Sequence, residues 1–502
     1  MNVLIFRGTN DIDGIDYAIE YKQRGDSVTV IQCDESMGMC PWNPYGSERC
    51  CKYCYKVSKK AFREYCPEGY DYIKLSSIIS EDDKKRSEEF QMDFNSVAEL
   101  KNILYDNVEI GYGAFSSYVT ASQNVMPNIS KELKAYIQHL MRMEIKVYEA
   151  LKRFVKERGY DLIIFHNGRF AMYRPFLGLA RNLHINYIAT EHFDSNGVTY
   201  KNDFCNDVPH SVEANMQKAR ELWDKALPQE REDKGRNFYE WRKNGVPSGT
   251  DKKVYVGNQE KGKLPEGWDD SVENIAIFNS SEDEQCAIDK KIDSQNLFEN
   301  QYVALKTLFE HYKNDKSKHF YLRIHPRLKI VPYKSHTALY NLKYDNVTIF
   351  APESPMSSYT LMDHCDKTIV FNSTMGLEAA YWGKPVIALV RDFASEFNLA
   401  YFPETEEKFW ELLDNKSLKT LNNENALIMG NFFLREEPPY NHIIIKVEDS
   451  ILGHKFNTQS ITKLFGSYAL NRVVFGLFMI GRLGHDRKFR YLPETIGHLT
   501  DE

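Results

Sequence analysis

The residues best suited to chemistry in this 502-residue chain follow short apolar runs. His325 follows the run FYLRI, and the triplet Asn372, Ser373 and Thr374 follows the run KTIVF. An imidazole can donate a hydrogen bond to a phosphate or ribose oxygen. Hydroxyls and free backbone N–H groups at the start of a helix bind anions, which the helix dipole favours. These segments predict a site for a phosphate-bearing ligand, and the alternative for Ser373 and Thr374 is plain helix capping.

Other polar residues of the C-terminal half extend this predicted site. Glu378 falls within the first two turns of the helix expected after Thr374, where a carboxylate would lie near a ribose. Gly376 lets that helix approach its neighbours closely. The remaining candidates for holding the ligand follow neighbouring apolar runs and are Ser280, Ser281, Arg323 and Glu353.

A second group of candidates lies in the N-terminal half. His166 follows the run DLIIF, with Arg169 close behind it, and Glu191 and Asp194 follow the run INYIAT. A carboxylate or an imidazole can take the proton of an attacking hydroxyl, and a carboxylate can also act as a nucleophile. Either role suits Glu191 or Asp194. The alternative is an ordinary polar loop with a helix cap and a surface arginine.

These candidates must be held by alternating strands and helices. The polar stretch 226–270 is interpreted as an inter-domain region, and segment 111–120 as a loop or, alternatively, an ordinary turn and helix start. The chain starts with a strand at 2–6, a helix and a second strand at 27–33, and such units recur at 130–192 and at 274–390. This pattern predicts an α/β protein with two Rossmann-like domains and a cleft between them. In such sheets ligands bind at the carboxyl ends of the strands, where the candidates lie. The motif G-x-G-x-x-G is absent, so NAD binding is disfavoured.

The motifs of the second series resemble a known family when they are taken together. The His-Pro pair at 325–326, a Pro-Glu turn, the Ser/Thr turn and the segments GLEA and GKPV resemble the C-terminal domain of GT-B glycosyltransferases. They are most similar to bacterial capsule and surface-polysaccharide enzymes, including those that use CMP-activated Kdo or sialic acid. The resemblance covers about residues 274–390.

The resemblance implies roles for individual residues. His325 would recognise the nucleotide, Ser373 and Thr374 would bind phosphate, and the segment 279–284 would face the donor. The enzyme would move a sugar from a nucleotide-activated donor to a surface-polysaccharide or lipid-linked glycan acceptor, with no cofactor required for the transfer. The domains would be an N-terminal acceptor domain at 1–265, a nucleotide-sugar domain at 266–440 and a helical tail at 441–502.

Three other functions remain open at this stage. A polymerase that transfers a polyol phosphate from a CDP-activated donor, as in teichoic-acid-type synthesis, would share the fold. A sugar-nucleotide epimerase would need no acceptor. A non-catalytic scaffold subunit of a polysaccharide complex would keep its function when His325 is replaced, whereas a transferase would lose donor turnover.

A cysteine-rich segment at about 33–66 is the second unusual feature. The thiols of Cys40, Cys51, Cys54 and Cys66 could together bind a structural zinc ion, as a C-x2-C pair with two flanking cysteines. An iron–sulfur cluster is a second alternative. Reduced thiols, or a redox pair of Cys51 and Cys54, are the others. We expect any metal bound here to stabilise an inserted loop and to lie away from the catalytic site.

Composition and the chain ends complete the prediction. The net charge of −7 argues against a nucleic-acid-binding protein, which needs a basic footprint. The first residues do not form a secretory signal, and no apolar window is long enough to cross a membrane, so we expect a cytoplasmic protein. The tail from about 459 mixes apolar and basic residues. It suits contact with the inner face of the membrane or, alternatively, packing against the N-terminal domain.

Overall fold

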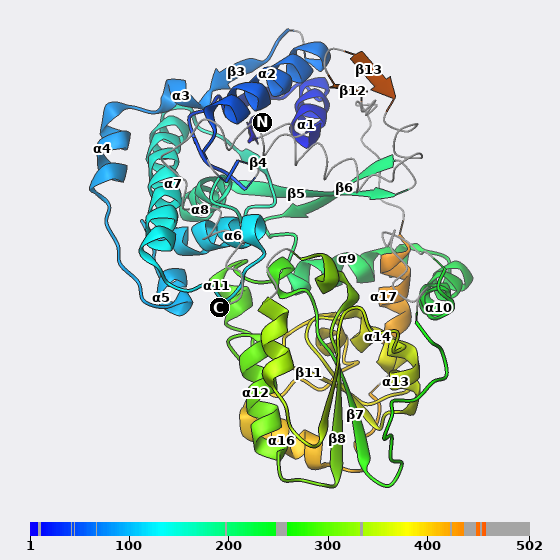
Figure 1. The fold of residues 1–502 in the computed structure, drawn as a ribbon. Coiled ribbons are helices and arrows are strands. Elements are labelled where there is room, and N and C mark those ends of the chain that lie inside the picture. The colour runs from blue at the N-terminus through cyan, green and yellow to red at the C-terminus, as the bar shows by residue number, and fades with distance from the viewer. Residues whose placement is uncertain are drawn as a thin grey trace.

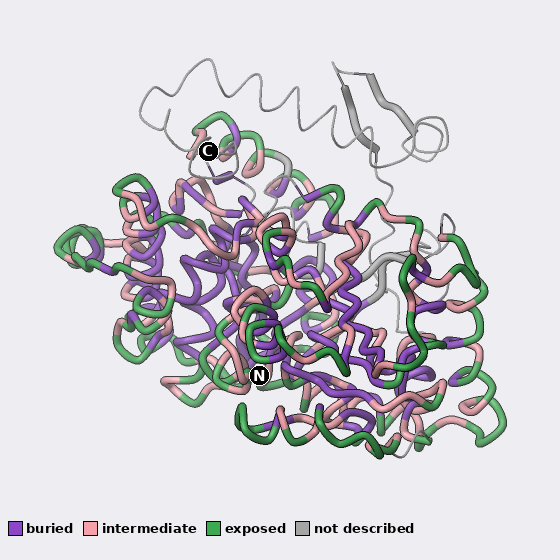
Figure 2. The backbone as a smooth tube through the Cα atoms, turned by 60° about the horizontal axis from the view of Figure 1, so that its bottom comes forward, coloured by how far each residue is buried: buried purple, intermediate pink, exposed green. Residues whose placement is uncertain are grey.

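Two β-sheets organise the chain, one in each half (Figure 1). The computed structural model describes residues 1–8, 12–41, 43–44, 46–66, 68–195, 198–246, 259–331, 335–421, 424–435, 448–451 and 454–457. The predicted amphipathic tail from about 459 lies outside these residues. Buried residues run through the interior of both halves, and exposed residues lie on the outer helices (Figure 2).

The N-terminal sheet has the strand order β3-β2-β1-β4-β5-β6. The first five strands are parallel neighbours, and β6 pairs with β5 in the antiparallel sense. Buried apolar side chains fill most of β1, β2 and β4, as expected where helices cover both faces of a parallel sheet. The strands are β1 (Asn2–Arg7), β2 (Ser27–Gln32), β3 (Asp71–Lys74), β4 (Leu162–His166), β5 (Asn186–Ser195) and β6 (Val198–Cys205).

The longest helix of the N-terminal half follows the sequence pattern. The predicted long helix is α7, which begins after the Ser130 cap and ends at Gly159, where φ is +70°. Segment 111–120 was expected to be a loop, but it lies in the buried helix α6. The helices are α1 (Ile12–Gln23), α2 (Glu48–Tyr65), α3 (Leu75–Ile78), α4 (Glu81–Glu89), α5 (Val97–Lys101), α6 (Ile110–Ser122), α7 (Lys131–Arg158) and α8 (Arg174–Leu183).

The C-terminal sheet has the order β11-β10-β7-β8-β9, with all neighbours parallel. Its strands are β7 (Glu273–Phe278), β8 (Lys318–Arg323), β9 (Val347–Phe350), β10 (Lys367–Val370) and β11 (Val386–Ala388). The helical segments of this half are η1 (Glu282–Glu284), α11 (Lys290–Asp293), α12 (Gln301–Tyr312), η2 (Pro326–Ile330), η3 (Ser335–Asn341), α13 (Ser358–His364), α14 (Thr374–Tyr381), α15 (Phe393–Glu396), α16 (Glu406–Asp414) and α17 (Asn425–Phe433). A hairpin of β12 (Glu448–Ile451) and β13 (His454–Asn457) follows.

This architecture confirms the predicted fold class. Each half is a Rossmann-like unit in which consecutive parallel strands are joined by helices. In both sheets the first strand of the unit lies at the centre, because the chain first adds strands on one side and then returns to the other. The structure therefore has the GT-B arrangement of two such domains.

Helices α9 (Val212–Lys225) and α10 (Pro228–Asn244) lie in sequence before the predicted domain boundary at 265. In space they pack against the C-terminal domain, since Phe238 and Tyr239 share an apolar core with β7, α14 and α17. The polar stretch 226–270, interpreted from sequence as an inter-domain linker, therefore contains a helix with a buried face. Residues 247–258 of that stretch lie outside the described residues.

Two facing glycines bring α10 and α17 together. A Cβ added to Gly430 would lie 2.3 Å from the carbonyl oxygen of Gly235, and one added to Gly235 would lie 2.6 Å from the carbonyl oxygen of Leu427. Only glycine permits backbones to approach this closely. We expect Gly430→Ala to lower the free energy of unfolding by about 1–3 kcal/mol, the usual cost of overpacking. Denaturant titration measures this change, and Lys234→Ala on the exposed side of α10 is the control. Equal stability of Gly430→Ala and the wild type would contradict the close packing.

The segment 282–293 joins the two domains. It follows β7 of the C-terminal sheet, yet Ala287 and Ile288 are buried in the apolar core of the N-terminal domain. The ammonium group of Lys101 lies 2.6 Å from a carboxylate oxygen of Asp293, and Arg174 donates to the backbone carbonyl of Ile288. The two domains are thus held together by a continuous interface rather than by a linker alone.

Within the part of the chain described by the structure, no helix is both long enough and apolar enough to cross a membrane.

Candidate functional site

The turn between β10 and α14 is built as the sequence predicts. Asn372 adopts a left-handed backbone conformation with φ of +47°, and Ser373 caps the helix, its hydroxyl accepting from the N–H of Met375 at 3.4 Å. The Thr374 hydroxyl accepts from the guanidinium of Arg242 at 3.0 Å. A Cβ on Gly376 would lie 3.0 Å from a methyl group of Val370, which explains the glycine. The turn presents hydroxyls and a helix N-terminus together.

His325 follows β8 and is fixed by two backbone contacts. Its N–H donates to the side-chain oxygen of Asn279 at 2.8 Å, and its Nδ1 accepts from the N–H of Arg327 at 3.2 Å. Burial, together with the charges of Arg327, Arg323 and Arg242, lowers the pKa of His325 to about 4. The ring is therefore neutral. Because Nδ1 accepts, we assign the proton to Nε2, which makes His325 a hydrogen-bond donor.

Arg323 orders the loop after β9. It is 2% exposed and donates to the backbone carbonyls of Ile324, Ala351 and Ser354. Burial lowers its pKa to about 10. Both terminal nitrogens of Arg323 are thus engaged by main-chain carbonyls, and the expected contact of Arg323 with the ligand stays a prediction. Glu353 lies in the same loop and is exposed.

Glu378 also has a different role from the one expected. It is fully buried, and its two oxygens accept from Arg242 (3.1 Å) and from the hydroxyl of Tyr359. A carboxylate so enclosed cannot reach a ribose in the cleft. Instead, Glu378 holds Arg242, which in turn reaches the Thr374 hydroxyl.

The two serines after β7 support other residues of the site. Ser281 is buried, donates to Asp283 and accepts from the guanidinium of Arg327 at 2.8 Å. The Ser280 hydroxyl accepts from the side-chain amide of Gln301 at 3.0 Å. Ser281 thus positions Arg327 next to His325.

Two of the N-terminal candidates, His166 at the end of β4 and Glu191 in the middle of β5, come together. The Nε2 atom of His166 lies 3.8 Å from one carboxylate oxygen of Glu191, and the side-chain amide of Asn167 donates to the other oxygen. Glu191 remains 30% exposed. The structure thus confirms that these residues are neighbours. The backbone of Asp194 lies in β5, but its side chain is outside the described residues.

Arg169 and His210 lie beside this pair, between the domains. Arg169 is buried, which lowers its pKa, and it donates to the backbone carbonyl of Glu284 at 2.7 Å. It also lies 3.3 Å from Nε2 of His210. A guanidinium only donates, so Nε2 must accept and the proton of His210 is on Nδ1. Burial, together with the charges of Arg169 and His166, lowers the pKa of His210 to about 3, so this ring is neutral.

Glu284 connects the two groups of residues. Its backbone carbonyl accepts from Arg169 of the N-terminal domain, and its carboxylate lies 2.5 Å from the guanidinium of Arg327, next to His325. The acid–base candidates of one domain and the phosphate-binding candidates of the other therefore meet at a single interface. This is the arrangement that a transfer between a donor and an acceptor requires.

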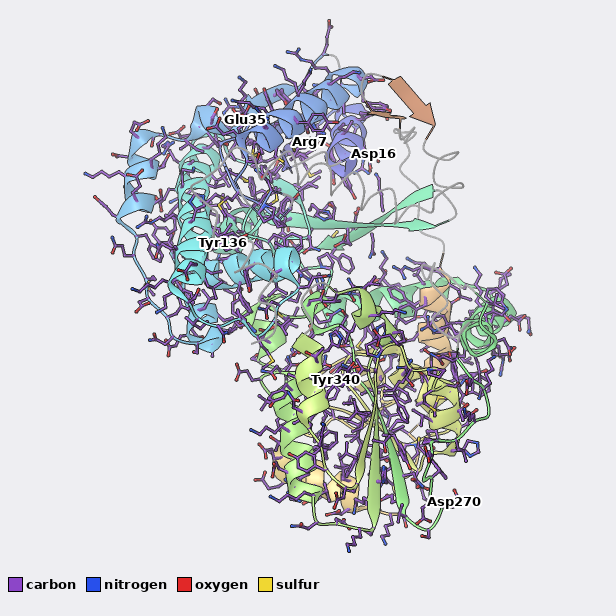
Figure 3. All side chains as sticks on the ribbon, in the orientation of Figure 1. Arg7, Asp16, Glu35, Tyr136, Asp270 and Tyr340 are labelled. Carbon is purple, nitrogen blue, oxygen red and sulfur yellow. The ribbon has the colours of Figure 1, made fainter. Side chains whose placement is uncertain are left out.

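The four cysteines expected to bind zinc do not form one site. Segment 48–65 is the continuous helix α2 rather than a loop, and Cys66 ends it. At 1.5 Å per residue, Cys51 and Cys66 are about 22 Å apart along the helix axis. Arg7, labelled in Figure 3, contacts this helix by donating to the backbone carbonyl of Ser58. It also donates to the side-chain oxygen of Gln32 in β2. Among the residues whose placement is described, no three His, Cys, Asp or Glu side chains gather to hold a metal ion.

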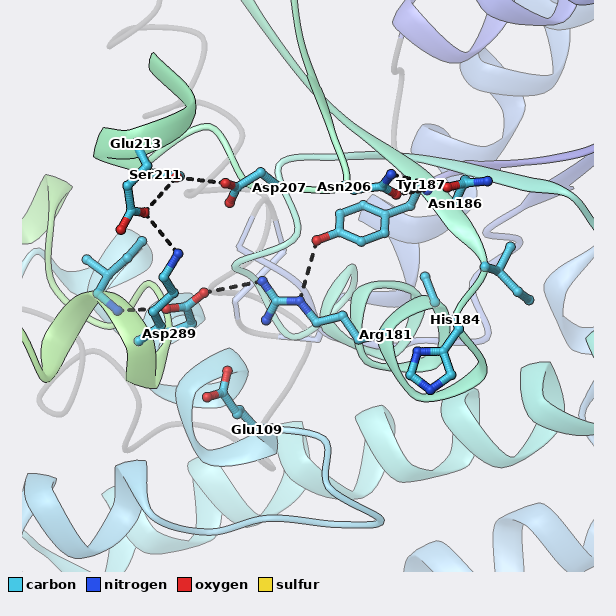
Figure 4. Close-up of a pocket in the computed structure, with 14 residues that line it drawn as sticks. Glu109, Arg181, His184, Asn186, Tyr187, Asn206, Asp207, Ser211, Glu213 and Asp289 are labelled. Atoms are coloured by element: carbon cyan, nitrogen blue, oxygen red, sulfur yellow. Dashed lines mark hydrogen bonds and ion pairs between the residues drawn. The ribbon is translucent and has the colours of Figure 1, made fainter. Parts of the chain in front are cut away.

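A hollow of about 590 Å³ lies at the other side of the interface (Figure 4). Its charged side chains pair with one another: Arg181 with Asp289 at 3.4 Å, and Lys291 with Glu213 at 2.9 Å. Asp289 also caps α11. These pairs are consistent with a structural seam between the domains.

Part of the C-terminal half is similar to a known protein family. Residues 282–401 match the family model described as "Capsule polysaccharide biosynthesis protein". The C-terminal domain is similar to capsule polysaccharide biosynthesis proteins. The matched segment includes His325 and the turn at 372–374. This match supports a role in capsule-polysaccharide biosynthesis. A search of curated proteins returns no match.

Several solved structures are distantly similar to this chain. The β-Kdo 2,4 transferase of Thermosulfurimonas dismutans KpsC is 14% identical, with 54% of this chain and 79% of that chain covered and a TM-score of 0.36. The β-Kdo 2,7 transferase of the same protein is 13% identical, with 63% and 88% covered and a TM-score of 0.32. The UDP-GlcNAc 2-epimerase of Neisseria meningitidis is 12% identical, with 86% and 97% covered and a TM-score of 0.28.

Three residues of the site were not predicted from sequence. Arg242 lies in a segment interpreted as a linker, His210 follows β6, and Arg327 comes two residues after His325. Of these, Arg327 could have been predicted from the sequence, because it directly follows the His-Pro pair. Arg242 and His210 reach the site only through tertiary packing.

Proposed function

We propose that this protein is a glycosyltransferase that moves a sugar from a nucleotide-activated donor to a surface-polysaccharide or lipid-linked glycan acceptor. The observation that carries the proposal is the hydroxyl-bearing helix start at 373–374, which Arg242 contacts, together with the neutral imidazole of His325, which lies near the charges of Arg242 and Arg327. Such an arrangement favours the phosphate groups of a nucleotide donor.

The acceptor hydroxyl would be activated by the opposite domain. Glu191 is accessible, and its orientation is fixed by Asn167 and His166. In this role Glu191 takes the proton of the acceptor hydroxyl while the hydroxyl oxygen bonds to the anomeric carbon. The bond from that carbon to the donor phosphate breaks, and the nucleotide leaves with the electron pair. The Nε2–H of His325 and the start of α14 stabilise the negative charge on the departing phosphate.

Membrane contact is a separate part of the proposal. It rests on the apolar and basic tail from about 459, whose residues are outside the described ranges. The expected position at the inner face of the membrane therefore stays a prediction.

Donor binding provides the first test. We expect CMP, CDP, UDP or GDP, or one of their sugars, to raise the melting temperature, since a ligand at 100 times its Kd adds about 2.7 kcal/mol of stability. Because His325 and Ser373 would contact the phosphates, His325→Ala and Ser373→Ala should each weaken binding of that nucleotide at least about tenfold, the loss of one good hydrogen bond.

Thr405→Ala is the matched control for capping. Thr405 caps α16 as Ser373 caps α14, accepting from the N–H of Lys408, and α16 lies at the far end of the domain (Figure 1). It should lose stability without losing nucleotide affinity. If no nucleotide raises the melting temperature of the wild type, or if Ser373→Ala binds as tightly as Thr405→Ala, the proposed function is wrong.

A further inference from the structure

Helix α2 carries a row of basic side chains on its outer face. Its 18 residues include six basic and two acidic ones, whereas the whole chain has a net charge of −7. The helix lies on the outer side of the N-terminal domain, away from the C-terminal domain (Figure 1). Five of its basic residues are exposed, and we call them the basic stripe: Arg49, Lys52, Lys56, Lys60 and Arg63.

Helical geometry aligns the basic stripe. Its members recur every three or four positions, so they lie on one side of a helix with about 3.6 residues per turn. The opposite side is buried, since Phe62 is 3% exposed and packs against Tyr70 and Tyr72. From Arg49 to Arg63 the stripe is about 21 Å long. The packing of the buried side therefore holds the stripe towards solvent.

Most charges of the stripe are not compensated. Among the described residues, only Lys52 of the five has an ion pair, with Glu48 at 3.4 Å, and both of these side chains are more than half exposed. Exposed pairs of this kind contribute little. Because the protein as a whole is negatively charged, an anionic surface would repel it except where this face points towards that surface. The stripe therefore suits a negatively charged partner in one orientation.

The position and composition of this face favour a membrane surface as that partner. The stripe lies on the outside of a helix, where a flat anionic surface can reach all five charges at once. Tyr53 is 62% exposed and lies one turn from both Arg49 and Lys56. Tyrosine is typical of the membrane–water interface, where its ring meets apolar chains and its hydroxyl meets water. Basic helix faces of this kind are typical of proteins that bind anionic lipids.

We infer that α2 docks the N-terminal domain on an anionic phospholipid surface, with the basic stripe facing the lipid phosphates. This surface is separate from the tail at 441–502 and from residues 282–401, which match the family model. The inference goes beyond the proposed function, because docking through α2 does not depend on which reaction the protein catalyses.

Vesicle flotation with the full-length protein tests this docking. The probes are vesicles of phosphatidylcholine alone and vesicles of phosphatidylcholine and phosphatidylglycerol in equal parts. We expect the protein to float with the second kind and not with the first. Binding should weaken when the salt concentration is raised, because salt screens interactions between exposed charges.

A triple variant removes three charges from the stripe and introduces residues that favour a helix. Its substitutions are Lys56→Gln, Lys60→Gln and Arg63→Gln. One basic residue near an anionic surface contributes about fivefold in affinity, so this variant should bind the phosphatidylglycerol vesicles about 100-fold more weakly. The matched control removes three charges from exposed lysines that lie away from α2 and should bind as the wild type does. Its substitutions are Lys234→Gln, Lys306→Gln and Lys416→Gln.

Three outcomes would overturn the inference. The first is equal binding to both kinds of vesicle, and the second is equal binding by the triple variant and its control. The third is tighter binding to duplex DNA than to the vesicles, lost in the triple variant, which would make the stripe a nucleic-acid surface instead. Circular dichroism shows whether each variant is folded, and Lys56→Glu alone takes the place of the triple variant if that variant unfolds.

Nucleotide binding separates this inference from the proposed function. Both triple variants should keep the rise in melting temperature that a nucleotide causes, because α2 lies away from His325 and Ser373 (Figure 1). If no nucleotide binds while vesicle binding depends on the stripe, the proposed function is wrong and the docking surface remains. If a nucleotide binds while the triple variant and its control bind vesicles equally, only the docking surface is wrong.

Discussion

Replacing Arg242 by methionine is expected to lower the free energy of unfolding by about 3–5 kcal/mol and to abolish nucleotide binding. The guanidinium donates to the fully buried carboxylate of Glu378 and to the hydroxyl of Thr374. Removing one partner of a buried ion pair leaves the other charge without compensation, which accounts for the expected loss of stability. The start of α14 also loses a contact that holds it. Chemical denaturation and nucleotide titration measure the two effects.

A double variant separates stability from binding in this prediction. Arg242→Met combined with Glu378→Met replaces both charges with apolar side chains, which is often close to neutral for stability. We expect the double variant to recover most of the lost stability but not the nucleotide affinity. Lys234→Met, at an exposed position of the same helix, is the control. A single variant as stable as this control would show that the buried pair does not hold α14.

The second large effect is a gain in stability from Glu144→Gln at neutral pH. Glu144 is fully buried in α7, and both of its oxygens lack a hydrogen-bond partner among the described residues. Its carboxyl group faces Gly113 of α6, where an added Cβ would lie 2.5 Å from Oε2. Burial raises its pKa well above the ordinary value of 4.5, and the charge of Arg174 opposes this only in part.

The pH dependence of this effect follows from proton binding. With its pKa raised in the folded state, Glu144 stays protonated in the fold at pH values where the unfolded chain has lost the proton. Stability therefore falls as pH rises from about 4.5 towards the folded-state pKa, by about 1.4 kcal/mol per pH unit. At pH 7 the wild type should be less stable than Glu144→Gln by up to about 3 kcal/mol.

Denaturant titrations at several pH values check this prediction. The two proteins should have similar stability near pH 4.5, and their curves should separate as the pH increases. Glu157→Gln, an exposed position on the same helix, should follow the wild type throughout. A difference between Glu144→Gln and the wild type that does not change with pH would contradict a protonated Glu144.

Much of the fold could be predicted from sequence because local patterns determine it. Apolar runs that end in polar residues marked β4, β8 and β10, and the cap at Ser130 with Gly159 at the other end marked α7. The same patterns put His166 and Glu191 on neighbouring strands, and in the structure the two side chains lie 3.8 Å apart. These predictions depended on residues close to one another in sequence.

The cysteines show where sequence reasoning failed. Their spacing resembled a metal-binding loop, but the segment from Glu48 to Tyr65 forms a helix with Ser47 as its cap. Spacing in sequence implies closeness only if the chain turns back, and a helix instead carries Cys66 away from Cys51. The capping serine was present in the sequence as a signal for this helix.

The sequence by itself determined the two Rossmann-like halves, the strand ends that carry candidate residues and the capped helix start at 372–374. Only the tertiary structure decided which polar residues reach a ligand. Glu378 and Arg323 are buried by neighbours distant in sequence, and Arg242 enters the site from α10. The physical reason is that burial and ion pairing depend on contacts between elements, which local hydrophobic patterns do not specify.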